Sequence, residues 1–200
     1  KGLARCTGDI VGWINSDDLL LPGSLVKVAT AYISHPNKIL LGDVIHFDED
    51  RRMALTVKQR DVSFKNLALQ PISKCAWQQP GTFIPTGSIP LGRLALDESL
   101  RYTFDLDWMC RLLQIIDVFY LSEPVARFRL HPNSKTVKEK LLWLPEIDEV
   151  FKRYWEQVSC DNKAYLSALF ELFHAAIFLG GYTWEPERGR QYMQKALRLY

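Results

Sequence analysis

The chain has 200 residues, of which 48% are apolar, and its 25 basic and 23 acidic side chains give a formal net charge of +2. A chain of this length and composition buries enough apolar surface to fold without disulfides or structural metals, so the collagen-like, disordered and knottin-like classes are excluded. The two signs of charge are interspersed and give no broad basic surface. Nucleic acid is therefore not an expected partner.

The cysteines and the apolar stretches bear on where the protein works. The four cysteines are Cys6, Cys75, Cys110 and Cys160. They have no metal-site or redox-pair spacing, so we expect reduced thiols in a cytoplasmic protein. The longest apolar stretch, residues 166–181, contains Glu171 and His174 and falls short of the roughly 18 uninterrupted apolar residues of a membrane span. We expect a buried helix there and no transmembrane segment.

The first part of the chain predicts an α/β unit. Residues 10–14 form an apolar run typical of a strand buried on both faces of a parallel or mixed sheet, and polar residues 15–18 end it. A helical pattern follows over 22–35, and a second apolar strand over 39–47. This order places the expected ligand site at the carboxyl ends of the strands.

The remaining elements are expected in the following order. A short strand (53–57), a helical piece (64–69) and a loop (78–81) lead into a strand (82–84), then a helix (104–116) and two strands (118–121 and 125–130) separated by Pro124. After Thr136 the composition changes to charged and aromatic helical segments, expected over 137–158, 163–179 and 186–200. We therefore predict two domains, residues 1–136 and 137–200.

Two pairs of carboxylates are candidates for the chemistry. Asp17 and Asp18 lie at the end of a predicted buried strand, where their mutual repulsion and desolvation become favourable if Mg²⁺ or Mn²⁺ neutralises them. Asp105 and Asp107 lie in the predicted first turn of a helix, which keeps carboxylates ionised and able to accept a proton from an acceptor hydroxyl. The alternatives are a solvated helix-capping turn for the first pair and ordinary first-turn acid enrichment for the second.

Other polar residues are candidates for binding a substrate. Arg129 and His131 could bring a cation or an imidazole to a diphosphate, although a lone histidine is more often a surface residue. The amides of Gln78 and Gln79 could orient a sugar or an acceptor, although consecutive glutamines are common in loops.

Several ordered motifs resemble one enzyme family. The run from Gly8 to Gly23, GDIVGWINSDDLLLPG, closely resembles the metal-binding stretch of glycosyltransferase family 2, the inverting enzymes of the GT-A fold. Further similar segments follow in the family's order: Leu41-Gly42-Asp43, Gln78 to Phe83, Leu96 to Leu100, Asp105 to Trp108 with Arg111, and Phe128 to His131 with Ser134. The resemblance covers roughly residues 1–136 and leaves out the helical tail.

The resemblance implies a role for each matching residue. Asp17, at the last position of a D-x-D-type motif, would be the direct metal ligand, and Asn15 occupies the first position, where the family commonly has an aspartate. Asp18 would support the site, Asp105 would be the general base, and His131 would touch the metal or the diphosphate. The implied reaction is a single displacement in which an acceptor hydroxyl attacks the anomeric carbon and the product anomer is inverted.

The implied fold is an α/β fold, a partial GT-A mixed sheet with flanking helices, followed by a C-terminal α-helical segment. Family members begin with strands and a helix that bind the nucleotide base and ribose, and the sequence shows only a helix end before Gly8. Since there is also no initiator methionine, we expect this chain to be the C-terminal part of a longer enzyme and inactive alone.

The preferred hypothesis is a metal-dependent inverting glycosyltransferase. It would transfer a sugar from a nucleoside-diphosphate sugar to a saccharide, lipid-linked or protein acceptor in polysaccharide biosynthesis, in the cytoplasm and peripheral to the inner face of the membrane. The alternatives are a non-catalytic remnant or binding module with vestigial acidic sites, and another metal-dependent phosphate enzyme such as a nucleotidyltransferase. This sequence lacks the glycine-rich phosphate loop that would support the nucleotidyltransferase alternative. The preferred hypothesis requires both acidic segments to face one cleft.

Overall fold

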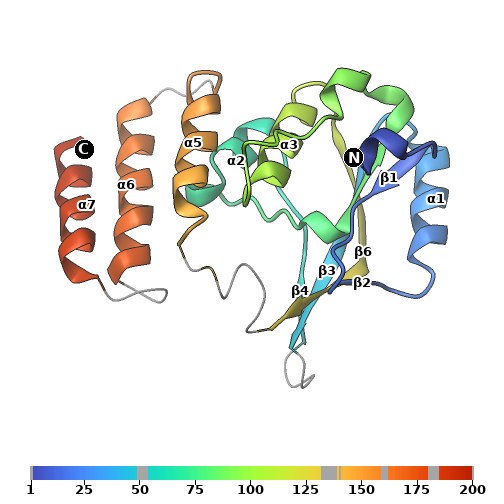
Figure 1. Ribbon diagram of the computed structural model, residues 1–200, viewed down its shortest axis with the longest axis horizontal. Coiled ribbons are helices and arrows are strands. Elements are labelled where there is room, and N and C mark those ends of the chain that lie inside the picture. The colour runs from blue at the N-terminus through green and yellow to red at the C-terminus, as the bar shows by residue number, and fades with distance from the viewer. Residues whose placement is uncertain are drawn as a thin grey trace.

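The computed structural model describes residues 2–48, 54–131, 139, 141–158, 162–179 and 185–199. Its strands are β1 (Ile10–Gly12), β2 (Leu19–Leu20), β3 (Ile39–Asp48), β4 (Ala54–Val57), β5 (Thr82–Pro85) and β6 (Val118–Leu130). Its α-helices are α1 (Ser24–Ser34), α2 (Phe64–Ala68), α3 (Phe104–Leu112), α5 (Leu144–Trp155), α6 (Lys163–Leu179) and α7 (Pro186–Leu199). The predicted mixed sheet with flanking helices and a C-terminal helical segment is confirmed (Figure 1).

The strands form one mixed sheet in the order β1-β5-β3-β6-β2, and β4 pairs with β3. Only the β3–β6 pair is parallel among the described strand pairs. The prediction of a first strand buried on both faces is wrong. β1 has three residues, lies at the edge of the described sheet, pairs only with β5, and buries only Val11.

The two predicted strands around Pro124 are a single strand. β6 runs continuously from Val118 to Leu130 beside β3, and the register shifts on either side of Asp43, which pairs with Pro124. Proline lacks the N–H that a regular ladder needs, and a shift in register accommodates it. At this point a Cβ on Gly42 would lie 2.4 Å from the Val125 side chain, so that side chain packs against the backbone of residue 42 because this residue is a glycine.

Helices cover the two faces of the sheet with separate sets of apolar side chains. Alternate residues of β3 point to opposite faces, so Leu40 packs with Val28 of α1 on one face, while Ile39 and Leu41 face α2 and α3 on the other. Figure 1 shows α1 alone on its side of the sheet and the remaining helices on the other. The second face carries the larger core, which includes Met109 of α3.

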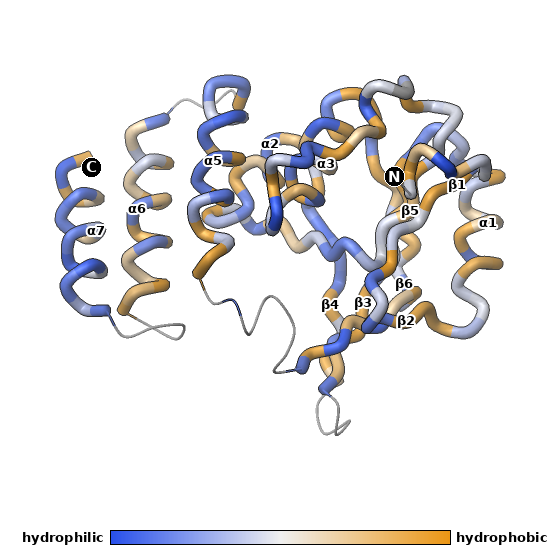
Figure 2. Tube along the Cα trace, in the orientation of Figure 1, coloured by the Kyte–Doolittle hydropathy of each residue, from blue (hydrophilic) through white to orange (hydrophobic). Residues whose placement is uncertain are grey.

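The C-terminal helices α5, α6 and α7 stand side by side (Figure 1). α5 belongs to the main core, because Val150, Phe151 and Tyr154 pack in the same cluster as α3 and the sheet. Figure 2 shows that α6 is largely apolar and α7 largely hydrophilic, as expected for an inner and an outer helix. The predicted boundary between residues 136 and 137 lies outside the described residues. In the part of the chain that is described, no helix is both long and apolar enough to cross a membrane.

Candidate functional site

A cleft of about 540 Å³ lies where the ends of β1, the loop before β5, the start of α3 and the start of α5 meet. It is lined by Trp13, Asn15, Asp17, Gln70, Trp77, Gln78, Gln79, Pro80, Arg101, Tyr102, Thr103, Phe104, Asp105, Leu106, Phe128, Trp143 and Ile147. The two acidic segments therefore do face one cleft, as the sequence analysis requires. Asp17 comes from one wall and Asp105 from another.

The turn that carries Asp17 is fixed to the end of β6. The Oδ2 atom of Asp17 lies 2.9 Å from Nε2 of His131, and Nε of Arg129 donates to the backbone oxygen of Asp17 at 3.1 Å. The hydrogen bond to His131 is the main cause that lowers the pKa of Asp17, and it outweighs the opposing effect of burial. Asp17 therefore stays ionised and half-exposed at the cleft.

Asp18 holds this turn in place through hydrogen bonds of its side chain. Its side chain is buried, and its Oδ1 accepts the backbone N–H of Arg129 at 3.0 Å while Oδ2 accepts the Asn15 amide at 3.2 Å. Burial raises the pKa of Asp18, against the effect of the Arg129 hydrogen bond. Asp18, Arg129 and His131 do not line the cleft itself, and they hold the segment that does.

The donor set around Asp17 fits a hard cation that takes most of its ligands from a substrate. Among the described residues, no three His, Cys, Asp or Glu side chains gather into a metal-binding group. Mg²⁺ is commonly held by only one or two carboxylates together with water and substrate phosphates. The Asp17 carboxylate, with Asn15 and His131 beside it, offers that kind of partial site.

The loop with Gln78 and Gln79 is organised by a buried residue that the sequence analysis missed. Gln59 donates from Nε2 to the backbone oxygens of Gly42 and Gly81, at 2.6 and 3.2 Å, and its Oε1 accepts the backbone N–H of Gln78 at 3.0 Å. A Cβ on Gly81 would lie 2.2 Å from the Gly42 oxygen, so only glycine permits this approach. A polar side chain in a short loop gives no sequence signal for such a role.

The two glutamine side chains have partners of their own. Oε1 of Gln78 lies 2.7 Å from Nε2 of His46, and Nε2 of Gln79 donates to the backbone oxygen of Trp13. The Asn15 amide approaches Oε1 of Gln79 at 3.5 Å. The loop is thus tied to the Asp17 turn, and both glutamines stand at the cleft.

Asp105 is a carboxylate with no charged side chain in contact among the residues that the structure describes. Its Oδ1 accepts the backbone N–H of Leu106 at 2.8 Å. Burial among apolar and aromatic groups, opposed only by backbone hydrogen bonds, raises its pKa to about 6. A carboxylate with a raised pKa at the wall of a cleft has the properties of a general base.

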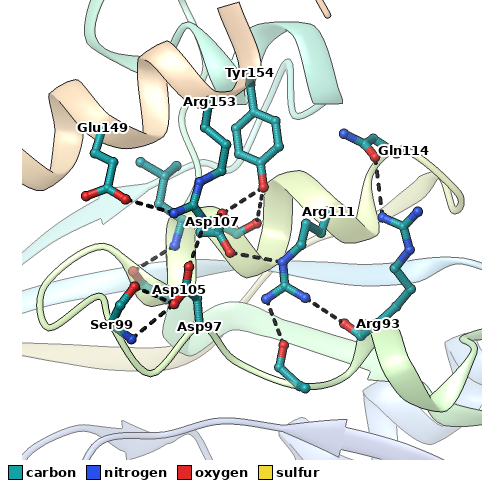
Figure 3. A network of polar contacts seen from close by, with 12 residues as sticks. Arg93, Asp97, Ser99, Asp105, Asp107, Arg111, Gln114, Glu149, Arg153 and Tyr154 are labelled. Atoms are coloured by element: carbon teal, nitrogen blue, oxygen red, sulfur yellow. Dashed lines mark hydrogen bonds and ion pairs between the residues drawn. The ribbon is translucent and has the colours of Figure 1, made fainter.

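Asp107 points away from the cleft into the fold. Its side chain is fully buried, with Arg153 Nη1 and the Tyr154 hydroxyl both 2.7 Å from Oδ1 and Arg111 Nε 2.9 Å from Oδ2 (Figure 3). Arg153 also reaches Asp97 at 2.8 Å. The structure does not bring Asp107 to the cleft, where the sequence analysis expected it to contact substrate, and its contacts join α3 to α5.

Several lining residues were not found from the sequence. Arg101 and Tyr102 precede α3, and Trp143 and Ile147 belong to the helical tail, which the sequence analysis kept apart from the site. An aromatic in a charged helical segment is a weak signal, because the same pattern is typical of ordinary helix packing. The tail nevertheless completes one wall of the cleft.

The chain matches no protein-family model, and no curated protein matches it. Solved structures of S. aureus TarS, a glycosyltransferase, do match its fold. The TarS 1-349 structure in complex with UDP-GlcNAc aligns over 98% of this chain with a TM-score of 0.60 and 15% identity. The chain has a glycosyltransferase-like fold.

The other TarS structures give the same result over slightly less of the chain. The TarS 1-349 complex with UDP has a TM-score of 0.53 at 16% identity, and a further TarS structure has 0.55 at 14% identity, each over 88% of this chain. This chain spans 59% and 49% of the two TarS 1-349 chains and 30% of the third. It corresponds to only part of those proteins.

Proposed function

We propose that this chain is the metal-binding and base-bearing part of an inverting glycosyltransferase of family 2. The protein would transfer a sugar from a nucleoside-diphosphate sugar to a hydroxyl of a saccharide, lipid-linked or protein acceptor, in cytoplasmic polysaccharide biosynthesis. The observation that carries the proposal is the cleft in which Asp17 and Asp105 stand on different walls. The bound UDP and UDP-GlcNAc in the TarS structures favour a uridine nucleotide sugar as the first donor to test.

In this mechanism Asp105 accepts the proton of the acceptor hydroxyl while that oxygen attacks the anomeric carbon. The bond from the anomeric carbon to the diphosphate breaks on the opposite face of the sugar, so the product anomer is inverted and the nucleoside diphosphate leaves. Asp17 would hold Mg²⁺ or Mn²⁺, with Asn15 and His131 beside it. When bound, the ion would neutralise negative charge on the leaving diphosphate.

The other residues of the cleft orient the reactants. Gln78 and Gln79 present amides at the wall between the two acidic residues, and Trp77 and Tyr102 offer aromatic faces. A saccharide ring has an apolar face that stacks on aromatic side chains and hydroxyls that bond to amides. The apolar walls also keep water from competing with the acceptor hydroxyl.

Calorimetric titration with Mn²⁺ and a panel of nucleoside diphosphates tests the donor site. We expect Mn²⁺-dependent binding of UDP that Asp17→Asn weakens by about tenfold or more, while Asp9→Asn, which removes an exposed carboxylate outside the cleft, leaves it unchanged. Absence of binding by every nucleotide at millimolar concentration contradicts a donor site in this chain. Binding by this chain without sugar transfer by the whole enzyme that contains it supports the alternative of a non-catalytic binding module.

A further inference from the structure

One carboxylate of the C-terminal segment accepts hydrogen bonds from three consecutive backbone N–H groups that lead into α3. Glu146, on α5, accepts the backbone N–H of Arg101 at 2.9 Å, of Tyr102 at 2.7 Å and of Thr103 at 3.0 Å. The Thr103 hydroxyl also approaches it at 3.3 Å. These three residues line the cleft immediately before Asp105.

The segment 101–103 needs such an acceptor because its own helix does not supply one. Thr103 is the N-cap residue of α3, and its side chain makes no capping hydrogen bond. Backbone N–H groups at a helix start have no partner within the helix, and a carboxylate placed there also interacts favourably with the helix dipole. Glu146 thus fixes the backbone at and just before the N-cap from a helix that lies more than 40 residues further along the sequence.

The same contacts keep the Glu146 carboxylate ionised. Burial alone would raise its pKa, but the hydrogen bonds from the three backbone N–H groups and from Thr103 outweigh burial, and the pKa is lowered. Hydrogen bonds to an ionised acceptor are stronger than those between neutral groups. Glu146 therefore holds the segment firmly at neutral pH.

α5 also binds α3 on the C-terminal side of Asp105. Arg153 and Tyr154, two turns along the helix from Glu146, bind the buried carboxylate of Asp107 (Figure 3). Asp105 therefore lies between two positions, 103 and 107, that are both fixed by α5. Its side chain can take a defined direction into the cleft without a polar side-chain partner of its own.

We propose that Glu146 is a positioning residue, which sets the direction of Asp105 in the cleft by fixing the backbone of residues 101–103. The proposal rests on the proposed function, in which Asp105 is the general base. It gives the C-terminal segment a part in the reaction, since α5 contributes both cleft-lining side chains and the support of the base. A misplacement of about 1 Å in a reacting group can reduce a rate about a hundredfold.

The variants Glu146→Gln and Glu146→Ala test this proposal, with Glu156→Gln as the matched control. Glu156 lies just after the last turn of α5 and pairs only with Lys163 at 2.8 Å, with a side chain 79% exposed. Amide hydrogen exchange should become about tenfold faster or more at residues 101–106 in the variants, more in Ala than in Gln, and stay unchanged in α6 and α7. The control should exchange as the unmodified protein does.

Sugar-transfer kinetics with UDP-GlcNAc, measured on the whole enzyme that contains this chain, supply the readout that a purely structural role would not move. We expect Glu146→Ala to lower kcat by about 10- to 100-fold while the KM for the donor stays within about twofold. Faster exchange with unchanged kcat, or unchanged exchange, overturns the positioning role. Absence of transfer by the unmodified whole enzyme that contains this chain overturns the proposed function instead, and the exchange result then still decides whether Glu146 fixes this segment.

Discussion

Asp105 and Asp107 are two residues apart in α3 and have opposite environments. An α-helix turns by 100° per residue, so their side chains point in directions about 200° apart. Asp105 faces the cleft and has no charged partner within the described part of the chain, while Asp107 is enclosed by Arg111, Arg153 and Tyr154. One carboxylate is available for proton transfer, and the other is a fixed structural charge.

The Asp105→Asn variant should separate function from stability. Burial raises the pKa of Asp105 to about 6, so above that pH the folded state holds a desolvated charge that the unfolded state does not. Removing the charge should increase the free energy of unfolding at pH 8 by ~1–3 kcal/mol, while turnover falls about a hundredfold or more because the base is lost. Urea unfolding and a transfer assay measure the two effects.

The matched control is Asp107→Asn, which should change stability in the opposite direction. It leaves two arginines around a neutral amide in a buried position, and we expect a loss of ~3 kcal/mol. Equal destabilisation by both substitutions would contradict the different environments assigned to the two aspartates.

The rate of transfer should depend on pH through the same carboxylate. Asp105 accepts a proton only when it is ionised, so kcat should be constant above its pKa of about 6 and fall about tenfold for each pH unit below it. A pH–rate profile of the unmodified whole enzyme measures this fall in kcat at low pH. A profile that stays flat down to pH 4.5 would mean that Asp105 has an ordinary pKa or is not the base.

The sequence alone was sufficient to predict some residues that line the cleft, and it was not sufficient to predict the others. Asp17 and Asp105 each follow a recognisable local signal, a polar turn after a strand and a helix start. Which of Asp105 and Asp107 faces the cleft depends on what packs against the other side of α3, and that is α5, which lies far along the chain. The roles of Gln59 and Glu146 depend on backbone N–H and C=O groups that no side-chain pattern reveals.

At the scale of elements, the joint between α3 and α5 depends on Arg153. Its guanidinium spans Asp97, Asp107 and Glu149, and the hydrogen bonds from Ser99 and Arg153 lower the pKa of Asp97 to about 2. Arg153→Ala should lower the free energy of unfolding by ~2–4 kcal/mol, because the fully buried Asp107 loses one of its two cations. Urea unfolding measures the change.

The neighbouring Lys152→Ala is the control for this prediction. Lys152 is exposed on the same helix, and its replacement should change stability by no more than ~0.5 kcal/mol. Similar losses for the two variants would indicate that the helix itself, and not the ion pairs of Arg153, carries the effect.

The lengths of most elements were predicted from the local sequence pattern. The two wrong strand predictions, the burial of β1 on both faces and the interruption of β6 at Pro124, have a common cause. The extent of a strand depends on its neighbours in the sheet as well as on its own sequence. Pro124 interrupts the local pattern, but the shifted register of β3 at Gly42 and Asp43 lets β6 continue past it. β1 has the apolar composition of a central strand but has only β5 beside it, so most of it stays uncovered.

At the scale of the whole molecule, the row of C-terminal helices is joined through a buried histidine. His174 of α6 places Nε2 2.8 Å from Asp148 Oδ1 of α5 and Nδ1 2.9 Å from the Phe170 oxygen. Its ring stacks on Tyr192 of α7 at 4.8 Å. Both ring nitrogens face oxygen acceptors, so this arrangement is fully satisfied only when the imidazole carries both protons.

This arrangement makes the stability of the molecule depend on pH. Burial lowers the pKa of His174, but the hydrogen bonds to Asp148 and Phe170 and the charges of Asp148 and Glu171 outweigh burial and raise it. A histidine with a raised folded pKa stabilises the fold fully below its unfolded pKa, near 6.5, and this contribution is lost as the pH rises through the folded value. The denaturation midpoint should therefore decrease over the window of rising pH that starts near 6.5.

Within that window, the His174→Gln variant separates the contribution of the histidine from those of the other groups with shifted pKa values. Asp105 titrates at about pH 6, and burial raises the pKa of Cys75 to about 11. His174→Gln keeps one hydrogen bond but cannot titrate, so its midpoint should change much less over the window, whereas His35→Gln, on the far side of the sheet at the end of α1, should keep the slope of the unmodified protein. An equal slope in His174→Gln would show that another group carries the pH dependence.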